Sequence, residues 1–397
     1  MSVKDLLIVE IAEGVAGPCC GLQFADLGAR VIKIEPPAGD RTREWGPPVA
    51  EDDAAIFIHL NRGKESITLD LTQDDGRARL DAILAAADAV LAQNDPAEEN
   101  LPDWSEVARR HPHLVVCEID DLGPVGPHGG LPGSELTVQA MSGFTRYVGE
   151  AGGPPCRVGF EIAGMATAMH AYQAVAAGIL SRNRTGEGQY VRVSALNSLL
   201  SMKTILLAVQ TGGMDFWSGF HLNGPHWPAD TGWHTKDGQV TFDFRHEQRE
   251  EWVAFCERIG QGHLPNDPEY KDWRSTIYLG DRRFTHGEPY RKWFAQQTCA
   301  DASALINELG GISVKFHDYG EMLAHPQVEH LDTLIDVPDE VEAGRRQIGF
   351  PFRYAGEPRR KEYGRAPRLG EHTAAVLEEF CNAKAGRSEA TGTGRNR

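Results

Sequence analysis

The stretch best placed to do chemistry is residues 156–194, where a carboxylate precedes a long helix of small residues. Glu161 stands at the expected start of this helix, where the helix dipole favours a negative charge. A glycine-broken turn at 184–189 follows the helix, and a strand is expected at 190–193. On its own, the stretch predicts a buried helix with an acid at its start.

A second group of candidate residues is a cluster of histidines and tryptophans. Its members are His221, His226, His234, His246, Trp217, Trp227 and Trp233. The histidines form no HxH or HxxxH pair, and the seven cysteines are scattered without a CxxC, so the pattern argues against a metal site. An aromatic substrate pocket is the better interpretation, with His226, Trp227 and Trp233 as candidate contacts.

The composition is that of a globular enzyme with an acidic balance. The 397 residues are 41% hydrophobic and carry a formal net charge of −17, which argues against binding to nucleic acid or to an anionic membrane surface. No apolar run approaches the roughly 20 residues of a membrane span, and the start, MSVKDLLIVEIAEG, lacks the pattern of a signal peptide. We therefore expect a cytoplasmic protein.

The elements that position these residues begin with strands and helices in alternation. Apolar runs predict strands at 6–11 and 29–35 around a helix at 20–27, which is a βαβ unit and hence part of a parallel sheet. Further strands are expected at 67–71, 89–92 and 114–119, and further helices at 76–86, 135–142 and 196–210.

The composition changes near residue 213, which indicates a second domain. A strand at 238–244 and amphipathic helices at 247–259 and 290–308 predict a smaller α+β fold there. The expected organisation is a large domain at 1–215, a small domain at 225–325, a return to the large domain at 330–385 and a disordered tail at 386–397.

Several stretches together resemble one family, the class III CoA-transferases, which includes formyl-CoA transferase and carnitine CoA-transferase. The stretches are AGPCCGLQFADLGARVIKIEPPAGDRTR, LNRGKESITLDL, the strand ending in Asn94, SELTVQAMSG, RNRTGEGQYVRVS, LAHPQV and FPFRYAG…APRLGEHT. Each stretch is a weak signal alone. Their order and spacing over about residues 5–380 identify the chain as a member of the family.

The resemblance implies an α/β fold, with a Rossmann-like parallel-sheet large domain and a small α+β domain, in an interlocked dimer with a homologous subunit. It implies an acyl-CoA and a carboxylic acid as substrates, CoA being a substrate and no cofactor being bound covalently. The residues that it places at CoA are Gly14, Val15, Ala16, Arg41, Arg43, Arg62, Lys64, Leu69, Asn94 and Ala195. It also places Glu135 and Gln139 at the substrate.

The family nucleophile is missing from this chain. In the family, an Asp carboxylate attacks the thioester, and CoA thiolate converts the resulting anhydride into an enzyme–CoA thioester that the acceptor acid resolves. That Asp ends a segment resembling V-G-x-x-x-A-D, which here reads VGFEIAG and ends in Gly164. The only carboxylate nearby in the sequence is Glu161, almost one helical turn earlier. Glu161 is either a replacement nucleophile or a charge at the helix start.

Other departures concern cations and histidines. Pro36, Glu98 and Glu99 stand where the family often carries basic residues for the CoA phosphates. The related α-methylacyl-CoA racemases use a His–Asp pair, whose positions here are Ser134 and Gly164, which argues against racemase chemistry by that route. His170, six residues past Gly164, is better interpreted as a hydrogen-bonded core histidine.

Three hypotheses follow. The chain is a CoA-transferase that works alone through Glu161, or the nucleophile-lacking subunit of a heteromeric transferase, or an isomerase or lyase of the same fold with a different, aromatic ligand. The combined loss of the nucleophile and of phosphate-binding residues favours the subunit hypothesis.

Overall fold

The structure, a computed structural model, describes residues 2–50, 53–94, 100–146, 154–204, 232–245, 247–273, 276, 286–338, 346–352, 355–356 and 362–382. The chain divides into two compact units. The first comprises Met1–Ser142, Val158–Met202 and Gln327–Arg397, and the second Gly143–Arg157 and Lys203–Pro326. The tail predicted to be disordered, 386–397, lies outside the described residues.

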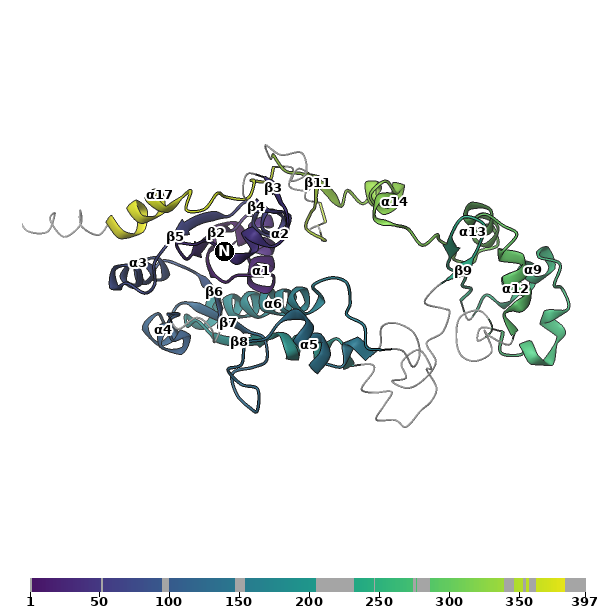
Figure 1. The fold of residues 1–397 in the computed structure, drawn as a ribbon, viewed down its shortest axis with the longest axis horizontal. Coiled ribbons are helices and arrows are strands. Elements are labelled where there is room, and N and C mark those ends of the chain that lie inside the picture. The colour runs from purple at the N-terminus through teal and green to yellow at the C-terminus, as the bar shows by residue number, and fades with distance from the viewer. Residues whose placement is uncertain are drawn as a thin grey trace, which may run out of the picture. The chain divides into compact units, whose positions relative to one another are not determined.

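A six-stranded parallel sheet forms the centre of the first unit (Figure 1). Its strands are β1 (Leu7–Ile11), β2 (Arg30–Glu35), β5 (Glu65–Thr68), β6 (Ala89–Gln93), β7 (Val115–Asp120) and β8 (Tyr190–Ser194). The spatial order is β5-β2-β1-β6-β7-β8. The first three strands run outward from β1 on one side and the last three run outward on the other, which is the doubly wound order of a Rossmann fold. The predicted parallel α/β architecture is confirmed.

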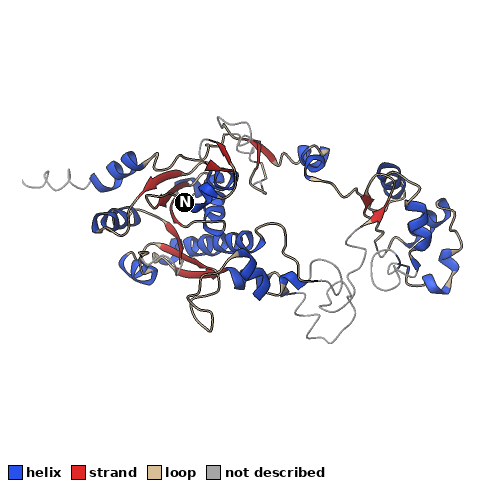
Figure 2. Ribbon diagram, viewed as in Figure 1, coloured by secondary structure: helices blue, strands red, loops and turns tan. Residues whose placement is uncertain are grey.

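Helices cover both faces of this sheet, as the blue and red ribbons of Figure 2 show. Side chains of a strand alternate between faces, so Ile8 belongs to one apolar cluster and Val9 to the other. The Ile8 cluster packs against α1 (Ala16–Asp26) and α6 (Ile162–Thr185). The Val9 cluster packs against α3 (Asp74–Leu84), α4 (Trp104–Arg110) and α17 (Thr373–Leu377).

Smaller elements complete the first unit. They are α2 (Ala55–Asn61), α5 (Glu135–Met141), α7 (Ala195–Ser201), the antiparallel pair β3 (Pro48–Ala50) and β4 (Asp53–Ala54), and the antiparallel pair β11 (Leu334–Asp336) and β12 (Arg346–Ile348). The helix predicted at 196–210 is shorter than expected, since α7 ends at Ser201 and residues 205–210 lie outside the described ranges. No helix in the described ranges combines the length and hydropathy of a membrane span.

The helix α6 is the long small-residue helix expected from the sequence. Ala168 and Ala171 are fully buried against the sheet and α1, because alanine lets the two backbones approach closely. A Cβ on Gly178 would lie 2.7 Å from Cγ1 of Val115 on β7. The helix ends at Gly186, whose φ of +79° is the left-handed conformation that glycine adopts without strain.

The second unit has an aromatic core. Its described elements are β9 (Trp233–His234), β10 (Gln239–Val240), α9 (Arg249–Arg258), α12 (Glu288–Phe294), α13 (Cys299–Glu308) and α14 (Tyr319–Leu323), with α15 (Pro326–His330) beginning at its last residue. The strand predicted at 238–244 is limited to Gln239–Val240. The single helix predicted at 290–308 is wrong, because the chain breaks after α12 and the Thr298 side chain caps a new helix by accepting the N–H of Asp301.

We expect Gly188→Ala to destabilise the first unit. Gly188 donates its N–H to the carbonyl of Pro112 at 2.7 Å, and a Cβ there would lie 2.1 Å from the carbonyl oxygen of Leu114. Since backbone must move, thermal unfolding should reveal a loss of about 1–3 kcal/mol. Gly159→Ala is the control, because no atom of the described residues lies within 4 Å of its Cβ position. Equal melting temperatures for the two variants would contradict the prediction.

Candidate active site

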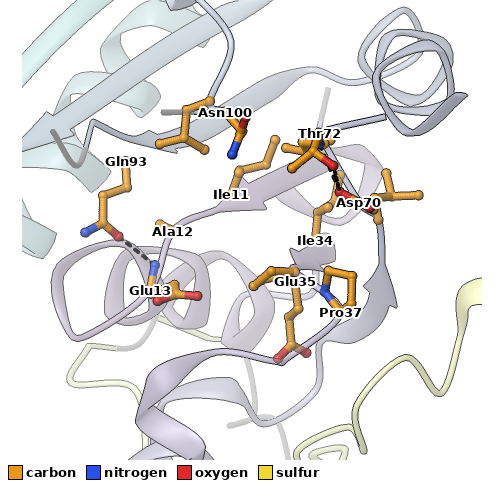
Figure 3. Close-up of a pocket in the computed structure, with 14 residues that line it drawn as sticks. Ile11, Ala12, Glu13, Ile34, Glu35, Pro37, Asp70, Thr72, Gln93 and Asn100 are labelled. Carbon is orange, nitrogen blue, oxygen red and sulfur yellow. Dashed lines mark hydrogen bonds between the residues drawn. The ribbon is translucent and has the colours of Figure 1, made fainter. Parts of the chain in front are cut away.

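The first unit has a pocket at the carboxyl ends of β1, β2, β5 and β6 (Figure 3). This is the crevice at the strand-order reversal, where doubly wound folds bind their ligands. The pocket has a volume of about 420 Å³, enough for a nucleotide-sized group. Its lining residues are Ile11, Ala12, Glu13, Ile34, Glu35, Pro36, Pro37, Leu69, Asp70, Leu71, Thr72, Gln93, Asn100 and Leu101.

The walls of this pocket are apolar and acidic. Glu13, Glu35 and Asp70 contribute carboxylates, and the described lining residues include neither lysine nor arginine. Figure 3 shows that Gln93 accepts the backbone N–H of Glu13, at 2.7 Å, which joins the ends of β6 and β1. A phosphate of CoA would therefore have to be held by groups outside these walls.

Two arginines expected at CoA make buried ion pairs. Arg43 binds Glu35 through two nitrogens, at 2.8 and 2.9 Å, and Asp53 at 2.8 Å. Burial alone would raise the pKa of Glu35, but the hydrogen bond from Arg43, the charges of Lys33 and Arg43 and the hydrogen bond from Ser66 together lower it. Arg62 binds Asp26 through two nitrogens and donates to the side chain of Gln347 at 2.8 Å. These contacts give Arg43 and Arg62 structural roles.

Lys64, also expected at CoA, belongs to a buried ion network. Glu10 accepts hydrogen bonds from Lys33, at 3.0 Å, and from Lys64, at 2.8 Å, and all three side chains are almost completely buried. Asp40 pairs with Lys33 at 2.7 Å. Burial lowers the pKa of Lys64, and the Lys33 charge lowers it further. The network ties β1, β2 and the end of α2 together.

Of the four cationic side chains expected at CoA, all of them described, Arg41 is the one that is partly exposed. Its side chain is 46% exposed, and its Nε lies 3.5 Å from Glu13. Its Nη2 lies 4.0 Å from the Cβ position of Gly14, in the loop after β1, where Gly14 has φ +74° and Val15 precedes α1. Ala16 is the first residue of α1. A phosphate contact by Arg41 stays a prediction.

Three further CoA candidates lie at the carboxyl edge of the sheet. Leu69 is buried in the pocket wall. Asn94 follows β6 and donates to the buried carboxylate of Glu118 at 2.7 Å. Ala195 is buried and begins α7 directly after β8. The structure leaves their contact with CoA untested.

Gly164 lies in the first turn of α6, beside two residues from other elements. A Cβ built on Gly164 would lie 2.9 Å from Cβ of Val15 and 3.7 Å from Oε2 of Glu135. Among the described residues, Glu135 therefore supplies the side-chain oxygen nearest to that position. Glu161 is the carboxylate nearby in the sequence, but folding also brings Glu135 in from α5.

Glu135 is held in place by three donors. Its Oε1 accepts the N–H of Ala163 and the side-chain amide of Gln139, both at 2.8 Å, and its Oε2 accepts the N–H of Gly164 at 3.0 Å. The first N–H groups of a helix have no partner inside the helix, so a carboxylate is a natural acceptor there. Gln139, fully buried, accepts the N–H of Val158 at 2.9 Å, which orients its amide.

Glu161 and His170 occupy the positions on α6 that the sequence indicated. Glu161 is the residue before the helix, and its side chain makes no capping hydrogen bond. His170 has both ring nitrogens in hydrogen bonds, with the carbonyl of Ala166 at 2.8 Å and the hydroxyl of Ser201 at 3.2 Å. The hydrogen bonds agree with the interpretation of His170, but its side chain is only partly buried, so it is not a core histidine.

Of the three residues of the second domain expected at a substrate, the structure describes one. Trp233 is 3% exposed and stacks on Phe294 within the core of the second unit, which is a packing role. His226 and Trp227 lie outside the described residues. Within the described ranges, no group of three or more His, Cys, Asp or Glu side chains could hold a metal ion.

Asp120 is a buried acid at the end of β7. Its Oδ1 accepts the N–H of Gly123, while its Oδ2 is buried and has no hydrogen-bond partner among the described residues. Burial raises the pKa of Asp120 to about 6, and the neighbouring charges of Glu118 and Asp121 add to the increase.

Comparison with known proteins gives a match over almost the whole chain. The model of CoA-transferase family III matches residues 3–373. The chain is similar to the succinate–glutarate CoA-transferase of Agrobacterium fabrum, with 29% identity over 95% of each chain. It is also similar to the acetyl-CoA:oxalate CoA-transferase of Acetobacter aceti, with 30% identity over 96% of each chain.

Solved structures show the same fold. A CAIB/BAIF family protein from Brucella suis superposes with a TM-score of 0.77 at 23% identity, covering 95% of this chain and 99% of that one. The described six-stranded parallel sheet with its flanking helices is thus an established architecture.

We expect Glu10→Gln to destabilise the protein by about 3–5 kcal/mol, because it leaves two buried lysines with one less compensating charge. Urea unfolding measures this as a lower midpoint. Glu106→Gln is the matched control: Glu106 pairs with Arg109 on the surface of α4, and its loss should cost less than about 1 kcal/mol. A Glu10→Gln midpoint equal to that of the control would refute a stabilising role for the network.

Asp120→Asn should stabilise the protein only above acidic pH. An unfolded aspartate ionises near pH ~4, whereas burial raises the pKa of Asp120 in the folded chain to about 6. Ionisation therefore costs folding free energy, a cost absent below about pH 4 and complete above about pH 6. We expect a melting temperature about 4 °C higher at pH 8 and unchanged at pH 4. The exposed Asp75→Asn is the control, and an equal gain at both pH values would contradict the assignment.

Proposed function

We propose that this chain, which belongs to CoA-transferase family III, transfers CoA between an acyl-CoA and a dicarboxylic acid. The observation that carries the proposal is the loop after β1. Glu13 of this loop lines the pocket at the strand-order reversal, and Val15 contacts the position beside the held Glu135 carboxylate. One loop therefore joins a nucleotide-sized pocket to a carboxylate, the two parts that transfer from a CoA thioester needs.

The relatives support the substrate class. The two described above are named for glutarate and for oxalate as acids, both of them dicarboxylic. In our proposal, Arg41 approaches a phosphate of CoA, and backbone N–H groups of the loop after β1 hold the oxyanion of the thioester. The acidic walls of the pocket repel phosphate. In our proposal the CoA phosphates therefore lie toward solvent, where the Arg41 side chain is partly exposed.

A second candidate function is that of a subunit in an interlocked dimer whose homologous partner supplies the nucleophile. Gly164 favours it, because this position has no side chain. The exposed stripe of Met165, Met169 and Leu180 along α6 also favours it, since apolar side chains at helical spacing fit a protein partner.

A transfer assay tests both functions. We expect the purified chain, given succinyl-CoA and glutarate, to form glutaryl-CoA, detected by chromatography with mass spectrometry. Arg41→Met should increase KM for succinyl-CoA about tenfold with kcat nearly unchanged, since it removes one charge-assisted contact.

The matched control for this assay is Arg109→Met, on the exposed surface of α4, which should behave as the wild type. Transfer that requires the addition of a homologous chain with an intact nucleophilic aspartate would support the subunit function instead. The absence of transfer with either arrangement would refute the proposal.

A further inference from the structure

One carboxylate oxygen lies beside Gly164. Since glycine has no side chain, the position that a family nucleophile would occupy is bounded by Val15 on one side and by Oε2 of Glu135 on the other. Glu135 is half-buried, and its neighbours Leu136 and Met165 are exposed. Among the described residues, Oε2 of Glu135 is therefore the side-chain oxygen nearest to the position of the missing nucleophile.

The two oxygens of Glu135 have different environments. Oε1 accepts two hydrogen bonds, from Ala163 and Gln139, while Oε2 accepts one, from Gly164. Oε2 therefore keeps more lone-pair capacity for attack on a carbonyl carbon. Oε1 has the surroundings of an oxyanion: a backbone N–H and an amide N–H converge on it at 2.8 Å.

Gln139 is oriented for this task. Its side-chain oxygen accepts the N–H of Val158, which directs its NH₂ group toward Glu135. A purely structural helix cap needs only the two backbone donors of α6. The buried third donor adds what a reacting carboxylate needs, a fixed partner for the charge that develops on Oε1.

We propose, resting on the proposed CoA-transfer function, that Glu135 replaces the missing aspartate as the nucleophile of this chain. Oε2 attacks the carbonyl carbon of the acyl-CoA, the C–S bond breaks, and the electron pair leaves with CoA thiolate. The thiolate attacks Cδ of Glu135, and the Cδ–Oε2 bond breaks to release the donor acid as a carboxylate. At this step Ala163 and Gln139 hold the negative charge on Oε1.

The second half of the reaction runs in reverse order on the acceptor. Its carboxylate attacks Cδ of the glutamyl–CoA thioester and displaces the thiolate, which then attacks the carbonyl carbon of the acceptor. The new acyl-CoA forms, and Glu135 is regenerated with one oxygen from the acceptor. Every bond formed is matched by one broken, and no oxidant or external proton source is required.

Glu161 is less well placed for the same role. It precedes the first turn of α6, and its side-chain oxygens lie farther from the Cβ position of Gly164 than the 3.7 Å of Glu135. Glu161 is therefore the rival candidate against which the role of Glu135 is tested.

The experiment combines kinetics with chemical trapping in the full chain. We expect Glu135→Gln to lower kcat for transfer from succinyl-CoA to glutarate by about 1,000-fold or more, while the increase in melting temperature on adding CoA persists. Wild-type protein incubated with succinyl-CoA and then with hydroxylamine should carry a hydroxamate in the tryptic peptide 111–146, which contains Glu135. Glu106→Gln is the matched control for the substitution.

The outcomes separate this inference from the proposed function. Transfer by Glu135→Gln within tenfold of the wild-type rate, or a hydroxamate in peptide 158–182, which contains Glu161, would overturn the role of Glu135 and leave CoA transfer standing. No transfer and no hydroxamate in the wild-type chain would overturn both. The trapping experiment uses the wild-type chain. It therefore decides the question even if the Glu135→Gln variant fails to fold.

Discussion

The hydrogen bonds from the first turn of α6 to Glu135 determine the geometry of the site. A helix of this length begins with N–H groups that need an outside acceptor, and Glu135 accepts two of them, at 2.8 and 3.0 Å. This contact joins the start of α5 to the start of α6 and places a negative charge where the helix dipole favours it. Because position 164 is glycine, Oε2 of Glu135 is the side-chain oxygen nearest to that position among the described residues.

A second constraint comes from buried charge in the same unit. A lysine or arginine removed from water needs a close counter-charge, and Lys64, Arg62 and Arg43 each have one. These pairs compensate their charges inside the fold. The pocket has acidic walls, and the proposed CoA contact depends on Arg41 and on backbone donors.

The sequence was sufficient to predict the layered fold, because buried parallel strands are continuous apolar runs and α6 is long and rich in alanine. It could not predict that Thr298 restarts a helix within 290–308, since a helical pattern continues through the break. The sequence also could not predict which distant residue pairs with a buried cation. Arg62 meets Gln347 across 285 residues of sequence, a contact that no local pattern encodes.

The candidate site divides in the same way. The absence of a nucleophile at Gly164 follows from counting along a motif, and Glu135 was expected near the substrate from its place in SELTVQAMSG. That Glu135 lies against Gly164, 29 residues away, depends on the packing of α5 on α6. Spacing along one helix indicated Glu161, while the tertiary contact brings in the closer carboxylate.

The most direct test of the central claim is the fate of the acceptor's oxygen. Glutarate labelled with ¹⁸O should be turned over with succinyl-CoA by the wild-type chain, and the tryptic peptides should be weighed and sequenced by mass spectrometry. Covalent catalysis by Glu135 predicts that one heavy oxygen is retained in its side chain, in peptide 111–146. Label on Glu161 in peptide 158–182, or turnover without label on any carboxylate of this chain, would contradict it.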